Sequence, residues 1–474
     1  MASPAHSETL DQALAFAYKN NPEIDAQRAT LRATDEGVAI ARSGYRPTIS
    51  SQLSVSSQNT NTKPGSPSEG SSRPRTFQLN LTQPLFTGFQ VTNAVNEAEA
   101  NVRAGQQTLR NTEQTVLLNA ATAYVDVVRD GALLRLNRSD LTFNLRELQA
   151  TQDRFSVGEV TRTDVAQARA AVSAARSAVS LAEANLRNSR AVYRQVVGRQ
   201  PANLREPPVP ARRIPRSLHD AIRIGLKSNP LVIQALYQEQ AARFNVDEVF
   251  GQLLPQAQLE ASYTATRDSS PVSELSEQAI VTSRLTIPLY LAGSVRAQIR
   301  QAKQTHVNTI QNIETVKRQV RQAVTSAWSL LRASQAQLVS NRAQVQANQI
   351  ALAGVREEER VGQRTLLDVL EAQQALLNAQ VALTTTQRDI VVNAYSLISA
   401  IGQLDGISYG VAATLYDPTE HYFEVRREWW RISITRRDGQ SERHDFWDRF
   451  GRHRPYKLGG QKRAHRGFTA QSRR

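Results

Sequence analysis

Cysteine is absent from the 474 residues, and aromatic residues make up only 6% of them. The absence of cysteine excludes a disulfide framework, a zinc site with thiolate ligands and a thiol nucleophile. No run of about 18 apolar residues occurs, so the sequence predicts no transmembrane helix. The chain starts Met1-Ala2-Ser3-Pro4 without a basic and apolar leader, so we expect an exported form to have lost its signal peptide.

The motifs of the common enzyme classes are also missing. The sequence has no P-loop, no dinucleotide-binding glycine fingerprint, no HExxH zinc motif and no nucleophile elbow. We therefore expect neither catalysis nor a bound cofactor or metal.

The formal net charge of +15 is concentrated towards the C-terminus. Residues 411–474 contain 15 Lys or Arg and 8 Asp or Glu, with several aromatic residues among them. Such a tail could bind nucleic acid or anionic lipid, but it contains no recognised nucleic-acid module. We therefore predict a basic extension that is disordered at least beyond residue 431, and no specific nucleic-acid partner.

Two copies of one pattern fill most of the chain. Residues 9–24 match residues 217–232, an offset of 208, and Val157-Gly158 recurs as Val361-Gly362, an offset of 204. Landmarks in the same order at nearly the same spacing indicate a tandem duplication. The predicted division is a first repeat at 1–200, a Pro- and Arg-rich linker at 201–216, a second repeat at 217–410 and the tail at 411–474.

Each repeat predicts one helix, two amphipathic strands and a helical hairpin. Polar and apolar residues alternate at 48–56 and 256–264, which is typical of strands with one apolar face. Residues 59–75 are rich in Ser, Pro and Gly and predict an exposed loop. The predicted elements are a helix over 8–42, a β-hairpin over 44–87 and a helical hairpin over 88–200, then a helix over 217–250, a β-hairpin over 252–291 and a helical hairpin over 292–403.

Small and apolar residues recur in the returning half of each helical hairpin. They follow 3-4 spacing from Val165 to Ser189 and again from Val369 to Asn393, which is typical of closely packed coiled coils. Gly158 lies where the first hairpin turns. Heptads alone leave a periplasmic coiled-coil adaptor or scaffold open as an alternative.

Four amphipathic strands per chain are too few to span a membrane alone. An open sheet in lipid would leave backbone groups unpaired, at several kcal/mol each. The smallest barrels have about eight strands, so two chains are the minimum and three would give twelve. A soluble sheet packed on helices is the alternative that alternation by itself leaves open.

Taken together, residues 8–410 resemble the TolC family of outer-membrane factors. Five landmarks carry the resemblance: LDQALAFAYKNNPEI from residue 10, QPLFTGF from 83, DRFSVGEVTRTDVAQARAAV from 153, SRLTIPLYLAGSV from 283 and RVGQRTLLDVLEAQQALLNAQ from 360. The resemblance implies a mainly α fold with β, in which a homotrimer forms a twelve-stranded barrel in the lipid of a Gram-negative outer membrane and an α-barrel in the periplasm. It further implies an exit duct for efflux or type I secretion, docked to a periplasmic adaptor and an inner-membrane pump or ABC secretion transporter.

The resemblance also places a gate at the helical tips. It implies that Arg364 bonds to Thr163 and Asp164. Glu359 stands where some family members carry a tyrosine that helps to hold the gate shut, so the resemblance does not extend to this part of the latch.

Two further sets of tip residues follow from the resemblance. Asp368 and Glu371 would form an acidic constriction in the lumen. They are i,i+3 neighbours on one helix face, so threefold symmetry would gather six carboxylates that attract cations. Two solvated surface acids are the alternative. The pairs Val157-Gly158 and Val361-Gly362 are candidate adaptor contacts, with simple helix capping as the alternative.

Overall fold

A computed structural model describes residues 8–60, 70–270, 273–406, 416–429, 434–435 and 441–442. Residues 1–426 form one compact unit and residues 427–474 a second. In the second unit β7 (Ile434–Thr435) pairs with β8 (Ser441–Glu442). The predicted disordered tail lies mostly outside the described residues and stays a prediction. The repeat boundaries likewise stay predictions, and the description below concerns the first unit.

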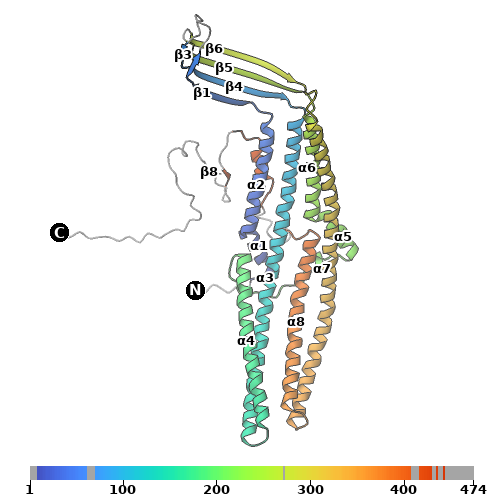
Figure 1. Cartoon of the computed structure of the whole chain (residues 1–474). Coiled ribbons are helices and arrows are strands. Elements are labelled where there is room, and N and C mark those ends of the chain that lie inside the picture. The colour runs from blue at the N-terminus through green and yellow to red at the C-terminus, as the bar shows by residue number, and fades with distance from the viewer. Residues whose placement is uncertain are drawn as a thin grey trace, which may run out of the picture. The chain divides into compact units, whose positions relative to one another are not determined.

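Long helices dominate the first unit, and the predicted helical hairpins are present as α3–α4 and α7–α8 (Figure 1). The helices are α1 (Leu10–Asn20), α2 (Pro22–Ser43), α3 (Gln90–Ser156), α4 (Arg162–Val197), the 3-10 helix η1 (Ala211–Arg213), α5 (Leu218–Ser228), α6 (Pro230–Gly251), α7 (Ser294–Arg360), α8 (Leu366–Ala400) and α9 (Glu420–Val425). The 67 residues of α3 and of α7 correspond to about 100 Å of helix. No helix in the described ranges combines the length and apolar character needed to cross a membrane.

The prediction of one continuous helix before each strand pair is wrong. The chain breaks at Asn21-Pro22 in the first repeat and at Asn229-Pro230 in the second, giving α1 and α2, then α5 and α6. A residue before proline avoids the helical conformation, and both asparagines are extended and cap the helix that follows. Each asparagine amide also donates to a carbonyl near the end of a returning helix, at Val196 or Ala400.

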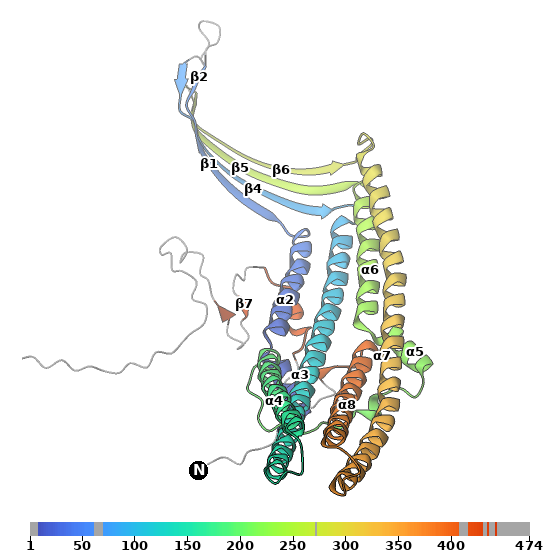
Figure 2. The same ribbon diagram turned by 60° about the horizontal axis from the view of Figure 1, so that its bottom comes forward.

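The strands of both repeats form one antiparallel sheet of order β1-β4-β5-β6 at one end of the helices (Figures 1 and 2). The strands are β1 (Thr48–Val55), β2 (Gln58–Thr60), β3 (Gly70–Ser72), β4 (Arg75–Phe86), β5 (Gln256–Ser270) and β6 (Ser273–Thr286). β4 pairs with β5, so the two repeats are joined in the middle of the sheet. β2 and β3 pair with each other where an exposed loop was predicted, and residues 61–69 between them lie outside the described residues.

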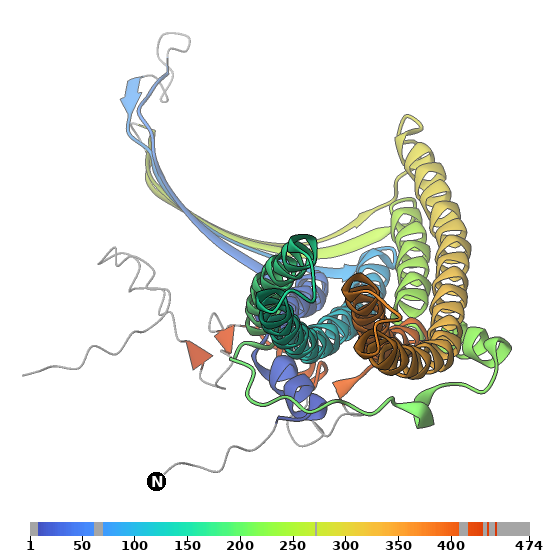
Figure 3. The ribbon, with the colours of Figure 1, turned by 90° about the horizontal axis from the view of Figure 1, so that it is seen from below.

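The helices lie in a curved row. Figure 3 shows α4, α3, α8 and α7 side by side when seen from below, and α3 packs on both α4 and α8. The predicted heptad seams pack inside the two hairpins. The buried members are Val165, Ala168, Val172, Ala175, Ala182, Leu186 and Ser189 in α4, and Val369, Ala379, Thr386 and Ile390 in α8.

Candidate functional site at the helical tips

The two tips end in small residues that no described part of the chain covers. Gly158 and Gly362 have φ of +84° and +78°. These values lie in the left-handed region, which glycine adopts more readily than other residues. A Cβ atom at either glycine would meet no atom within 4 Å. The side chains of Val157 and Val361 are 74% and 69% exposed. The tips are therefore open, compact turns.

Both returning helices start with the same capping box. In α4, Asp164 accepts hydrogen bonds from the backbone N–H and the hydroxyl of Thr161, each at 2.8 Å. In α8, Asp368 accepts them from Thr365 at 2.9 and 2.8 Å. The two carboxylates occupy equivalent positions of the repeats and fix the first turn of their helices. The sequence predicts a role in the gate for Asp164 and in the acidic constriction for Asp368. The capping role that the two residues share was not predicted.

Arg364 contacts acidic residues of its own tip. Its Nε lies 2.9 Å from Glu358, and its guanidinium lies 3.9 Å from Asp368. The hydrogen bond and charge of Glu358 raise the pKa of the Arg364 guanidinium. Among the contacts described within this chain, Arg364 reaches neither Thr163 nor Asp164, so the gate bond between them stays a prediction.

The two acidic residues predicted for the lumen differ in their surroundings. Hydrogen bonds from the backbone and hydroxyl of Thr365 lower the pKa of Asp368, and Arg364 lowers it further. Asp368 is therefore ionised at neutral pH. Glu371, one turn further along α8, is exposed. The constriction needs copies of the chain around an axis, and it stays a prediction.

Polar contacts that join the two helical hairpins were not predicted. We call them the interhairpin ladder. It consists of Asp126–Arg388 at 2.8 Å, Asp140–Gln373 at 2.8 Å, Glu147–Arg356 at 2.8 Å and, at the tips, Arg154–Glu359. The α3 members are seven or fourteen residues apart and therefore lie on one stripe of the helix.

The lowest two contacts of the ladder are ion pairs near the tips. Arg154 is in the last turn of α3, and the side chain of its partner Glu359 is only 19% exposed. Arg356 pairs with Glu147 and also stacks over the ring of Phe143, 4.7 Å from its centroid. Glu359 thus takes a charged partner on the other hairpin at the position where the resemblance implied a tyrosine.

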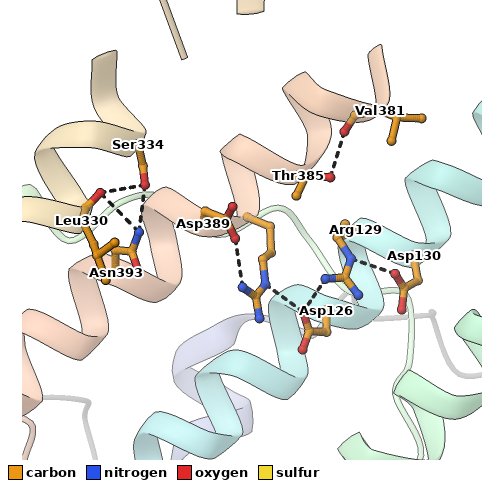
Figure 4. A network of polar contacts seen from close by, with 10 residues as sticks. Asp126, Arg129, Asp130, Leu330, Ser334, Val381, Thr385, Asp389 and Asn393 are labelled. Atoms are coloured by element: carbon orange, nitrogen blue, oxygen red, sulfur yellow. Dashed lines mark hydrogen bonds and ion pairs between the residues drawn. The ribbon is translucent and has the colours of Figure 1, made fainter. Parts of the chain in front are cut away.

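The highest contact of the ladder belongs to a larger network (Figure 4). Asp126 accepts from Arg388 of α8 and pairs with Arg129 of its own helix at 3.1 Å. Arg129 also pairs with Asp130, and Arg388 with Asp389. The Asp126–Arg388 pair joins the two hairpins, and the other ion pairs of the network lie within α3 or within α8.

Further down, Asp140 is buried and accepts from Gln373 and from Asn144. Burial raises the pKa of Asp140, although these two hydrogen bonds lower it. No group of three or more metal-ligating side chains occurs among the described residues.

Comparison with known proteins identifies the class. Residues 13–199 and 221–403 each match the family described as outer membrane efflux protein. The outer membrane efflux protein BepC of Brucella suis biovar 1 is 39% identical over 90% of this chain and 92% of its own length. TolC of Escherichia coli K12 is 27% identical over 85% of this chain and 84% of its own.

The fold agrees with this match. The crystal structure of the CmeC outer membrane channel of Campylobacter jejuni superposes with a TM-score of 0.73 at 18% identity, covering 88% of this chain and 89% of that one. The chain belongs to the outer membrane efflux protein family, whose members are passive channels and not enzymes. The alternative of a periplasmic adaptor or scaffold is not supported.

Proposed function

We propose that three copies of this chain form a closed barrel in the outer membrane of a Gram-negative bacterium and an α-helical duct in the periplasm. Substrates enter this duct from an inner-membrane pump or ABC secretion transporter through a periplasmic adaptor. The tips of the helical hairpins gate the duct, and the protein supplies no energy for transport.

The free edges of the sheet carry this proposal. β1 and β6 each have one partner among the described strands, and each exposes apolar side chains such as Ile49, Leu53 and Val281. In a bilayer, the outer backbone groups of both strands would be unpaired. Pairing β6 of one copy with β1 of the next removes both edges, and three copies give twelve strands.

Engineered cysteines test this pairing cleanly because the natural chain has none. Ser51→Cys in β1 is combined with Val281→Cys or Ser283→Cys in β6, which lie on the same face of the sheet. We expect oxidised membranes to give cross-linked dimers and trimers on non-reducing gels. The control pairs Ser51→Cys with Ala261→Cys, because β5 is shielded by β4 and β6. Monomers alone from every β1–β6 pair would contradict the shared barrel.

At the gate, the proposal combines contacts within and between chains. The ladder from Asp126 to Glu359 holds the hairpins of one chain together. Arg364 would then bond to Thr163 and Asp164, and Asp368 and Glu371 would line the narrowest part of the lumen. Among the described residues, Arg364 pairs only with acids of its own tip, which supports a further contact on assembly.

The exposed tip valines are proposed to dock the adaptor. Val157 and Val361, each next to an open glycine turn, present apolar surface that is largely uncovered by the described residues. We expect Val157→Lys with Val361→Lys to abolish adaptor pull-down and efflux. The control is Val209→Lys, an exposed valine of the linker. Unchanged pull-down by the tip variant would refute docking at these residues.

A further inference from the structure

Two arginines face each other on the apolar side of the sheet. Arg75 of β4 lies directly opposite Arg267 of β5 in the strand register. The other two strands place Val55 and Leu275 in the same row. Directly opposed side chains on antiparallel strands lie about 5 Å apart, and like charges at this distance destabilise the pair.

Among the described residues, no anionic side chain pairs with either arginine. The Arg75 and Arg267 side chains take part in no ion pair or hydrogen bond within the described ranges, and both residues are exposed. The nearest acid on this face, Glu277, lies one row closer to the helices, where its carboxylate faces the hydroxyl of Tyr263. Two guanidinium groups in directly opposed positions, without an acidic partner among the described residues, favour the binding of an anion between them.

The face that carries the pair is the one that would contact lipid. Successive rows towards the helices contain apolar side chains, among them Phe77, Leu79 and Leu81 of β4. Phe77 and Leu79 are exposed, whereas the polar residues between them are half-buried. Outward apolar and inward polar residues are the pattern of a membrane barrel.

The height of the pair matches a headgroup layer. Ten residues of β5 separate Arg267 from Ala257, which lies beside Phe86 in the last row before the helices. For strands tilted as in membrane barrels, ten residues rise roughly 24–28 Å, close to the apolar band of about 25 Å. Exposed aromatic rings of Phe86 and Tyr290 mark the lower edge of this band.

From this geometry we propose that Arg75 and Arg267 form a binding site for the phosphate of a lipid headgroup in the outer leaflet. Paired guanidinium groups donate several N–H groups to phosphate oxygens and can bind one phosphate from two sides. A bound phosphate also removes the repulsion between the two strands. The inference rests on the proposed barrel, because only a membrane-embedded sheet brings this row to lipid.

The test measures lipid binding to the full-length protein purified in detergent. The probes are diphosphoryl lipid A, phosphatidylglycerol, zwitterionic phosphatidylcholine and inorganic phosphate. We expect Arg75→Gln with Arg267→Gln to weaken binding of the phosphorylated anionic lipids by about thirtyfold, as two basic side chains at an anionic surface imply. Arg75→Lys with Arg267→Lys should weaken it less, since charge is kept and the bidentate geometry is lost.

The control is Arg169→Gln with Arg176→Gln, which removes the same charge from exposed positions of α4. It should leave lipid binding unchanged. Equal lipid A and phosphatidylglycerol binding by the Arg75/Arg267 variant and the parent would overturn the site. A variant that loses binding of inorganic phosphate but keeps lipid binding would also overturn the proposal, because the two arginines would then bind free anions and not a lipid headgroup. Conductance in planar bilayers separates the two proposals: a protein that never inserts refutes the barrel, whereas a conducting variant with unchanged lipid binding refutes the lipid site alone.

Discussion

Arg154 at the end of α3 contacts Glu359 at the end of α7, although 205 residues separate them. The contact ties together the tips of two hairpins that belong to different repeats. Both side chains are only partly exposed, at 39% and 19%, so solvent screens the pair incompletely. An opening that moves one hairpin away from the other must break this contact and the Glu147–Arg356 pair one heptad above.

Charge reversal at this pair should open the channel. Arg154→Glu places two carboxylates against each other and removes about 1 kcal/mol of attraction. We expect open time in planar bilayers to rise by up to about fivefold. Glu359→Arg should act alike, and the double swap should restore the parent behaviour. The control is Arg360→Glu, whose partner Glu357 lies on the same helix. A double swap as open as the single reversals would contradict a direct pair.

The proposed acidic constriction gives a second electrical prediction. Glu371→Gln should reduce the preference for cations roughly twofold, because it would remove one carboxylate per chain from the proposed constriction. Asp368→Asn should reduce it as well, but it also alters the capping box with Thr365. Asp164→Asn alters the matching box of α4 and serves as the control for that effect. Reversal potentials that stay the same in Glu371→Gln would count against the constriction.

The local patterns in the sequence predicted most of the fold. Alternation from Thr48 onwards gave the strands, because one face of each strand is apolar and the other polar. The seam starting at Val165 predicted the helical hairpins, because its small and apolar residues recur on one face of the helix and are buried there. The break at Asn21-Pro22 was readable from the proline and was missed.

The ladder between the hairpins could not be predicted in the same way. Acidic residues at Asp126, Asp140 and Glu147 share one stripe of α3, and this spacing was a usable signal for a polar contact surface. Their partners come from two other helices and follow no common period. Only the packing of α3 against α8, which brings α7 within reach of the α3 side chains near the tips, decides which residues meet.

A close backbone approach gives a prediction for stability. A Cβ atom at Gly251, the last residue of α6, would lie 2.4 Å from the carbonyl oxygen of Gly88. We therefore expect Gly251→Ala to lower the free energy of unfolding by about 1–3 kcal/mol. Gly37→Ala is the matched control, because a Cβ atom there would meet no described atom within 4 Å and alanine favours the helix by about 0.5–1 kcal/mol. Denaturant titration of both variants should give opposite signs, and equal signs would contradict this account.

Half-buried Glu113 gives a prediction for pH. Burial raises the pKa of Glu113, although Tyr18, Arg28 and Arg110 lower it. Tyr18 keeps its proton, because burial and then Glu113 raise its pKa to about 12. A raised pKa in the folded state means that folding favours protonated Glu113. Its stabilising contribution is complete below the ordinary pKa of 4.5 and is lost as pH rises through the higher folded value.

Glu113→Gln should therefore melt about 1–3 °C above the parent at pH 8, with a smaller difference at pH 4.5. The glutamine keeps an acceptor for Tyr18 and places no charge in the partly desolvated site. Glu314→Gln is the control of opposite sign, because Lys317 lowers the pKa of exposed Glu314 and its contribution disappears as pH falls. Thermal melts of the parent, Glu113→Gln and Glu314→Gln at pH 4.5 and pH 8 test this prediction. A Glu113→Gln variant that is less stable than the parent at pH 8 would show that the ionised carboxylate, held by Arg28 and Arg110, is the form that the fold requires.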